Sequence, residues 1–272
     1  MSNAIGGIAA QTMFLALADL AYRKANLEHA AACVANMLQA SLLMMILAVL
    51  ILAIAAPPVS LAGVHPVSPL LFVLYFGGLV MIKRARENPM WFPKDTDATE
   101  PDEPDHEETR GESGWGLWGQ FAGCALITMA AGYFITGAVS TMVDHYGWLR
   151  GSAAGTFMTA VATSLPELVT SIVAVRRGAL QLAVGGIIGG NCFDTLFAGA
   201  ADFAFRDGSI FHAAPAGDLN QVLFLIATTI AMTALLLSGL LFREKRGVAG
   251  IGFESLGVIG LYALMAVAVS RF

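Results

Sequence analysis

The chain has 272 residues, of which 57% are hydrophobic and 13% are charged, and its formal net charge is −5. A soluble domain usually carries about 25% charged residues. The composition therefore excludes an ordinary soluble protein and indicates an integral membrane protein.

The acidic side chains are concentrated in one stretch, because nine of the 20 Asp and Glu residues lie between residues 95 and 112. This stretch is rich in Pro, Glu, Asp and Thr and poor in apolar residues, which predicts a disordered, solvated linker over 84–114. The net charge comes from this linker and gives no indication of a nucleic-acid partner.

A helix that crosses a membrane needs about 20 apolar residues. Eight segments have this character: 3–22, 33–56, 67–82, 117–141, 152–175, 180–203, 219–242 and 249–270. The first of them begins with polar residues and lacks a basic leader, so it is interpreted as a span and not as a signal peptide. The expected fold is an all-α, polytopic membrane protein with about eight transmembrane helices.

Lys and Arg residues are distributed unequally between the two sides of these spans. One side collects twelve of them and the other collects three, Arg150, Arg206 and Arg271. The side with more positive charge is normally cytoplasmic. Both termini are therefore predicted to lie outside and the linker 84–114 inside. The compact loops favour a bacterial inner membrane as the location.

The chain contains an internal repeat. Residues 3–30 align with residues 186–213 at a constant offset of 183, without a gap, and eleven of the 28 positions are identical. Five predicted crossings separate the two copies, so they run in opposite directions, as in the inverted repeats of many secondary transporters. The predicted organisation is a partial first repeat of three helices (1–83), the linker (84–114) and a second repeat of five helices (115–272).

The two copies differ in extent. Two spans, 117–141 and 152–175, precede the second copy, whereas their counterparts would lie before residue 3. A symmetric protein would have ten spans. We therefore expect a truncated or misassigned start, or else the loss of two helices.

A carboxylate stands near the middle of the span 152–175, where a charge is costly and is usually functional. Glu167 follows Pro166, which has no N–H and so frees a carbonyl one turn earlier. The hydroxyls of Thr163 and Ser164 lie in the same turn. These are hard oxygen donors suited to Na⁺ or Ca²⁺. The alternative is a kinked helix with a salt-bridged Glu167.

The next span carries a second acid in the sequence Gly189-Gly190-Asn191-Cys192-Phe193-Asp194. Asn191 and Asp194 are three residues apart and share a helix face. If the two helices cross at their glycines, Glu167 and Asp194 meet, and two carboxylates neutralise one Ca²⁺. In the first copy Gln11 occupies the position of Asp194 and offers a neutral oxygen, although a packing role is nearly as plausible.

Two further acids recur in the repeat, Asp19 and Asp202, each followed four residues later by Arg23 or Arg206. We expect i, i+4 ion pairs at the level of the lipid headgroups.

The motifs Thr163–Glu167 and Gly189–Asp194 together resemble the second α-repeat of the calcium/cation antiporter superfamily, which includes the sodium/calcium exchangers. Residues 3–22 are similar to the later half of the first α-repeat. The resemblance implies that Glu167 is the central carboxylate ligand and that Thr163, Ser164, Asp194 and Gln11 face the site. The carbonyl of Ala160 is a further candidate ligand on the same ground.

The chain departs from the pattern of that superfamily at three points. Gly7 and Gly190 stand where the motif usually has Ser, and Gln11 stands where it usually has Asn. The first repeat of the superfamily also has its own Pro-Glu motif, on a helix that would precede Met1. This chain therefore supplies half of the expected carboxylate pair, and it lacks the helix that slides in such exchangers.

The leading prediction is a secondary antiporter, and not an enzyme, that exchanges Ca²⁺ for Na⁺ or H⁺ at a midplane carboxylate site. The expected partners are these ions and the lipid bilayer, with no resident cofactor. The sequence does not choose between Na⁺ and H⁺. The alternative is a non-transporting membrane subunit, which would need a partner or a missing N-terminal segment to complete its site.

Overall fold

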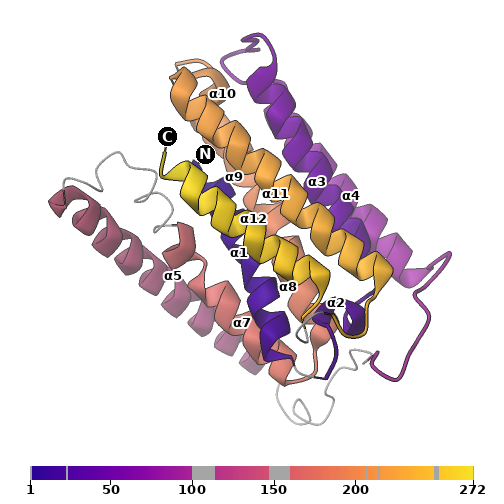
Figure 1. The fold of residues 1–272 in the computed structure, drawn as a ribbon. Helices are drawn as coiled ribbons and strands as arrows, with labels where there is room; N and C mark the ends of the chain where they lie inside the picture. Colours follow the sequence, from indigo (N-terminus) through magenta and orange to yellow (C-terminus); the bar gives the residue numbers. More distant parts are fainter. Residues whose placement is uncertain are drawn as a thin grey trace.

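The computed structural model describes residues 2–22, 24–99, 114–146, 160–205, 207–213, 215–247 and 251–271. Every regular element in these ranges is a helix (Figure 1). The helices are α1 (Ser2–Ala21), α2 (Leu27–Ala30), α3 (Val34–Ala55), α4 (Val67–Glu87), α5 (Gly114–His145), α7 (Leu165–Arg176), α8 (Leu180–Asp194), α9 (Leu196–Ala204), α10 (Ile210–Ala213), α11 (Ala216–Phe242) and α12 (Phe253–Val269). The predicted all-α class is confirmed.

Six of the described helices are long and apolar enough to cross a membrane: Ser2–Ala21, Val34–Ala55, Val67–Glu87, Gly114–Met142, Leu180–Ala204 and Gly217–Phe242. The apolar helix Phe253–Val269 is shorter. Helices satisfy their own backbone hydrogen bonds, which is why they are suited to a lipid environment. The chain is a polytopic membrane protein, as predicted, whereas the number of eight spans stays a prediction.

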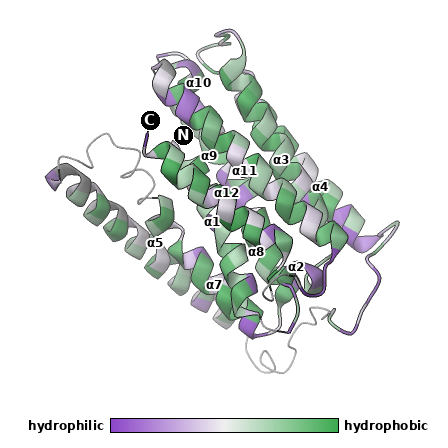
Figure 2. Cartoon of the chain, in the orientation of Figure 1, coloured by the Kyte–Doolittle hydropathy of each residue, from purple (hydrophilic) through white to green (hydrophobic). Residues whose placement is uncertain are grey.

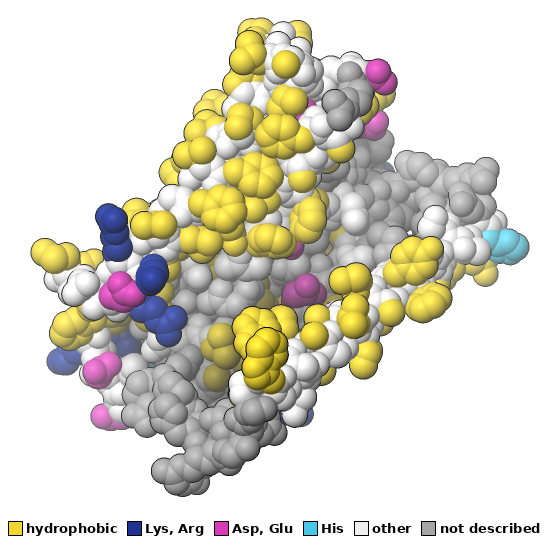
Figure 3. All heavy atoms as spheres, turned by 180° about the vertical axis from the view of Figure 1, so that it is seen from behind, with side chains coloured by type: hydrophobic (Ala, Val, Ile, Leu, Met, Phe, Trp, Pro, Cys, Tyr) yellow, Lys and Arg dark blue, Asp and Glu magenta, His cyan; other side chains and the backbone are white. Residues whose placement is uncertain are grey.

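The outer surface of the bundle is apolar along most of its length (Figure 2). Large side chains such as Val73 (66% exposed) and Trp118 (69% exposed) face outward, which is the arrangement expected of a surface in contact with lipid. Basic side chains gather at one end (Figure 3). We call this the basic end; it holds the last residues of α4, α7 and α11 and the first residues of α3, α8 and α12.

Helix α1 lies in the centre of the bundle and packs against α7, α8, α11 and α12. Its close packing depends on small residues. A Cβ atom added at Gly6 would lie 3.2 Å from Cβ of Ala160, and Ala9 and Ala10 are fully buried. A helix that is apolar all round is usually buried all round. This position brings Gln11, in the middle of α1, into the interior.

The two copies of the repeat make equivalent hydrogen bonds at opposite ends of the bundle, where α2 and α10 lie (Figure 1). Asp19 Oδ1 accepts from the backbone N–H of Leu27 at 2.6 Å, and Asp202 Oδ1 accepts from that of Ile210 at 2.8 Å. Both the acids and the donors are related by the offset of 183 residues. The two copies therefore run in opposite directions and end in the same local structure.

The prediction that these two acids lie exposed at the headgroup level is wrong. Asp19 is 1% exposed and Asp202 is 0% exposed, and both carboxylates bind backbone amides and serine hydroxyls. The two arginines that were expected to pair with them, Arg23 and Arg206, lie outside the described residues. The acids act as caps that fix the turn after a helix, because a buried carboxylate needs several donors.

The region predicted as a linker begins later than expected. Helix α4 continues to Glu87, and part of the segment that follows is bound to the basic end. Thr96 Oγ1 lies 2.7 Å from His29 Nε2, and the guanidinium of Arg243 donates to Thr99 Oγ1 at 3.0 Å. Residues 100–113 of the predicted linker lie outside the described residues.

The contact between α4 and α9 depends on Gly199. A Cβ added there would lie 3.1 Å from a ring carbon of Phe72 and 3.3 Å from the backbone oxygen of Ser68. We expect Gly199→Ala to destabilise the protein by about 1–3 kcal/mol through overpacking. The measurement is the thermal unfolding midpoint in detergent. Gly186→Ala is the control, because no atom lies within 4 Å of its new Cβ; an equal fall in both variants would contradict the prediction.

Candidate ion-binding site

The helix that contains Glu167 is broken one turn before it. Residues 160–163 are helical, Ser164 forms a turn, and α7 begins at Leu165 with Pro166 in its first turn. The backbone N–H of Ser164 donates to the carbonyls of Ala160 and Val161, both at 3.2 Å. The break follows from Pro166, which has no N–H to continue the helical pattern. It leaves the Ser164 side chain at the junction of two helical segments.

The carbonyl of Ala160 is already engaged in this turn. It accepts from the backbone N–H of Ser164 and from the hydroxyl of Thr163, each at 3.2 Å. A carbonyl oxygen has two lone pairs, so Ala160 is the weakest of the predicted ligands in this conformation. The Thr163 hydroxyl uses its hydrogen in this bond and retains lone pairs for another partner.

A second break lies next to the second acid. Helix α8 ends at Asp194, Thr195 forms a turn, and α9 begins at Leu196. The Thr195 hydroxyl donates to the carbonyl of Cys192 at 2.6 Å. Neither Pro nor Gly marks this break in the sequence, so it was not predicted. Both candidate carboxylates thus stand beside interruptions of their helices, where backbone and side-chain oxygens are less committed to helical bonds.

The structure brings the repeat-related residues Gln11 and Asp194 into contact. The Gln11 amide Nε2 donates to Asp194 Oδ2 at 3.1 Å. Asn191 Nδ2 donates to the hydroxyl of Thr12 at 3.1 Å, and this hydroxyl donates to the carbonyl of Ile8 at 2.8 Å. Helices α1 and α8 therefore meet through polar side chains. Thr12 was not predicted as part of this site, although its identity with Thr195 in the repeat is a signal that points to it.

Glu167 and Ser164 approach the same place from α7. Glu167 is close enough to Asp194 for the two carboxylates to interact electrostatically. A Cβ added at Gly7 of α1 would lie 3.5 Å from Ser164 Oγ, so the serine faces α1 at its paired glycines. Three helices thus contribute the predicted residues to one region.

Three oxygen atoms in this region are buried without a hydrogen-bond donor among the described residues. They are Gln11 Oε1, Glu167 Oε2 and Asn191 Oδ1. Each unsatisfied buried acceptor costs about 1–3 kcal/mol, and two nearby carboxylates also repel each other. A bound cation would satisfy these oxygens and remove the repulsion. The described residues contain no group of three His, Cys, Asp or Glu side chains suited to a metal ion, so the donors are two carboxylates and neutral oxygens.

Comparison with known proteins identifies the family. Residues 115–271 match the family described as sodium/calcium exchanger protein. The chain belongs to this family. The matched region contains both carboxylates, Glu167 and Asp194, and extends from α5 to α12.

Three curated relatives of this exchanger-family chain match over shorter regions. The putative antiporter CaxA of Alkalimonas amylolytica is 34% identical over 40% of the chain and 33% of its own length. The inner membrane protein YrbG of Escherichia coli K12 is 32% identical over 43% of the chain and 34% of its own length. The sodium/calcium exchanger MaX1 of Methanosarcina acetivorans is 38% identical over 25% of the chain and 19% of its own length. The chain thus spans about a third or less of each relative, and no solved structure matches it.

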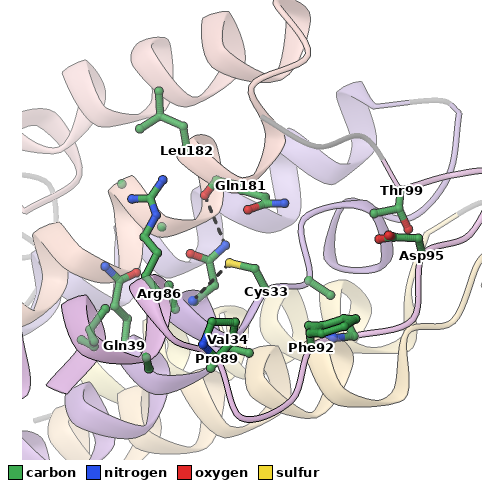
Figure 4. A pocket seen from close by; sticks show the side chains of 18 residues that line it. Cys33, Val34, Gln39, Arg86, Pro89, Phe92, Asp95, Thr99, Gln181 and Leu182 are labelled. Carbon is green, nitrogen blue, oxygen red and sulfur yellow. Dashed lines mark hydrogen bonds between the residues drawn. The ribbon is translucent and has the colours of Figure 1, made fainter. Parts of the chain in front are cut away.

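The exchanger-family chain also has a cavity of about 510 Å³ at its basic end. It lies between the start of α3, the end of α4, the segment after α4 and the start of α8; Figure 4 shows Gln39, Arg86 and Gln181 around it. None of the predicted ion ligands lines this cavity. Its wall reaches toward the site through Gln39, whose amide nitrogen would lie 3.3 Å from a Cβ added at Gly189.

Proposed function

We propose that this chain is a secondary antiporter that exchanges Ca²⁺ for Na⁺ or H⁺ across an inner cell membrane. Family membership favours ion exchange as the activity. The observation that carries the proposal is the set of buried, unpartnered oxygens of Gln11, Glu167 and Asn191 beside two carboxylates. Buried acceptors without donors, in a region of negative charge, are suited to a cation.

In this proposal Glu167 and Asp194 supply the charge that neutralises Ca²⁺. Gln11 donates its N–H to Asp194 and so turns Oε1 away from that bond. The remaining donors are Asn191 Oδ1 and the hydroxyls of Ser164 and Thr163. Together these approach the six to eight oxygen ligands that Ca²⁺ prefers.

Exchange follows from competition for the same two carboxylates. When Ca²⁺ leaves, the two negative charges repel each other in a buried place, unless Na⁺ or a proton replaces it. Binding of one ion therefore excludes the other. The breaks at Ser164 and Thr195 place the ligands on short helical segments, which is a common arrangement in transporters with inverted repeats.

The experiment is radioactive Ca²⁺ uptake into proteoliposomes that contain the full chain, under an imposed Na⁺ gradient, an imposed pH gradient or neither. We expect uptake that follows one of the two gradients and is absent in protein-free liposomes. Uptake that needs no gradient would contradict antiport. Absence of uptake under both gradients would show that this chain does not transport alone, as expected for a partner-dependent subunit.

Gln11 gives a separate test of the ligand set. Gln11→Leu removes one neutral oxygen ligand and the hydrogen bond to Asp194, and keeps the size of the side chain similar. We expect the apparent affinity for Ca²⁺ in the uptake assay to fall about tenfold, equal to about 1.4 kcal/mol. Gln120→Leu, at an exposed position of α5, is the control. Unchanged affinity in Gln11→Leu would assign Gln11 a packing role.

A further inference from the structure

A second group of buried acids lies at the basic end, in a part of the bundle formed by α1, α2 and α12. Glu28 on α2 and Glu254 in the first turn of α12 are each 1% exposed. Their carboxyl groups lie within hydrogen-bonding range of each other. Asp19, which caps the turn before α2, is the third acid of this group.

The oxygens of this pair have no donors among the described residues. Glu28 Oε2 and both carboxyl oxygens of Glu254 are buried and unpartnered. Two ionised carboxylates cannot hydrogen-bond to each other, because neither has a hydrogen to donate. Contact between the two groups in a buried place therefore requires a proton or a cation between them.

The repeat shows that the turn itself does not require these acids. The residue equivalent to Glu28, at the offset of 183, is Phe211, which is fully buried at the opposite end of the bundle. Both turns are capped by the equivalent aspartates, Asp19 and Asp202, with a serine hydroxyl at 2.9 Å and 2.6 Å respectively. One turn is thus completed by an apolar ring and the other by a carboxyl group, so the acid has a role beyond capping.

Two glycines make room for the Glu254 side chain. A Cβ added at Gly239 of α11 would lie 2.5 Å from its Cγ, and a Cβ added at Gly252 would fall on its carboxyl group. The carboxyl group is therefore tightly enclosed by backbone. An enclosure of this kind leaves little space for a hydrated cation, whereas a proton needs none.

The charged neighbours of the pair are mostly acidic. Asp19 acts on both Glu28 and Glu254, and Glu244, from the segment between α11 and α12, acts on Glu254. Residues 180–186 of α8 and 235–242 of α11, which approach this end, carry no ionisable side chain. The described basic groups nearby are engaged elsewhere or exposed: His29 binds the carbonyl of Arg243, the Arg243 guanidinium binds the carbonyl of Lys94 and Thr99, and Lys245 and Arg246 are exposed.

We propose that Glu28 and Glu254 form a proton-binding site at the basic end of the bundle, in which the carboxyl group of Glu28 carries the proton and donates it in a hydrogen bond to Glu254. The proton is assigned to Glu28 because Glu254 stands in the first turn of a helix, where the helix dipole favours the ionised form. Burial, with the nearby negative charges of Asp19 and Glu254, raises the pKa of Glu28 well above its ordinary value.

The site makes the contact between α2 and α12 dependent on pH. Glu28 has a higher pKa in the folded protein than in the unfolded chain. The proton therefore stabilises the fold fully below the ordinary pKa of Glu, about 4.3, and this stabilisation is lost as the pH rises toward the raised pKa. Above it, three buried carboxylates repel one another and separate the two segments. This inference concerns a different place from the proposed ion site and does not depend on antiport.

The test compares the full-length protein with Glu28→Gln in detergent. Glutamine donates an N–H to Glu254 at every pH, so it reproduces the charge and the hydrogen bond of the protonated pair. We expect the thermal unfolding midpoint of the wild type to fall by about 5 °C between pH 6 and pH 9, and that of Glu28→Gln to show a clearly smaller fall. Glu244→Gln, which alters a half-buried acid nearby, is expected to behave as the wild type. The same fall in Glu28→Gln and the wild type would overturn the proposal.

Infrared spectroscopy of the folded protein at pH 7 provides a second readout that does not depend on unfolding. We expect the C=O stretching band of protonated carboxyl groups to lose intensity in Glu28→Gln and to keep it in Glu244→Gln. If Glu28→Gln does not fold, titration of this band in the wild type decides, and its absence at pH 7 overturns the proposal. Stabilisation of the wild type by Ca²⁺ or Na⁺ at pH 9 that is lost in Glu28→Gln would show a cation at the pair and would also overturn it.

Discussion

Replacement of Glu167 by Gln is expected to lower the apparent affinity of the chain for Ca²⁺ at least about 100-fold and to abolish measurable gradient-driven uptake. The change removes one of the two charges that face the ion and leaves the shape of the side chain. The loss corresponds to about 2.8 kcal/mol, which is reasonable for a charge interaction in a buried site of intermediate dielectric constant. The fold is expected to tolerate the change, because Glu167 Oε2 has no donor to lose.

The measurement is Ca²⁺ uptake into proteoliposomes, with direct Ca²⁺ binding to the purified protein as a second readout. Asp218→Asn is the matched control, since Asp218 is an exposed acid in the first turn of α11. It removes the same charge far from the site and is expected to leave uptake unchanged. If Glu167→Gln retained normal affinity, Glu167 would be a structural residue of a kinked helix and the proposed ion site would be wrong.

Replacement of Asp202 by Ala is expected to lower the stability of the protein by about 3 kcal/mol or more. Asp202 is fully buried and accepts four hydrogen bonds at 2.6–2.9 Å. The donors are the backbone N–H groups of His65 and Ile210 and the hydroxyls of Ser68 and Ser209. Removal of the carboxylate leaves these donors buried without an acceptor, which costs far more than the bonds themselves contribute.

This prediction is checked by the thermal unfolding midpoint in detergent, which we expect to fall by about 6–10 °C. Asp202→Asn keeps one oxygen acceptor and is expected to lie between Asp202→Ala and the wild type. Asp207→Ala, an exposed acid in the turn that follows α9, serves as the control. A fall in Asp202→Ala no larger than that in Asp207→Ala would mean that the carboxylate does not hold the turn together.

Much of the candidate site was predictable because its signals are local in the sequence. A carboxylate within an apolar span is costly wherever the span packs, so Glu167 and Asp194 stand out without a structure. Pro166 predicts the helix break at Ser164 for a covalent reason, the missing N–H. The break at Thr195 has no such signal. It depends on a hydroxyl that binds the carbonyl of Cys192, a choice that many threonines in helices do not make.

The interpretation of Asp19 and Asp202 failed for the opposite reason. An acid followed four residues later by an arginine predicts an exposed ion pair when only the sequence neighbours are considered. The structure surrounds Asp202 with donors from α4 and from the segment that follows α9. Ser68 is far from Asp202 in the sequence, so no local pattern indicates that the two side chains meet.

The sequence by itself determined the class of protein, the helical spans, the repeat and the two acids in the membrane. Each of these follows from composition, from the length of apolar segments or from the cost of a charge in lipid. Only the tertiary structure decided that Gln11 donates to Asp194, that Asp19 and Asp202 cap turns, and that Glu28 meets Glu254. These contacts join residues distant in the chain. They depend on how closely helices pack, at glycines such as Gly239, and helix packing is not encoded in any single segment.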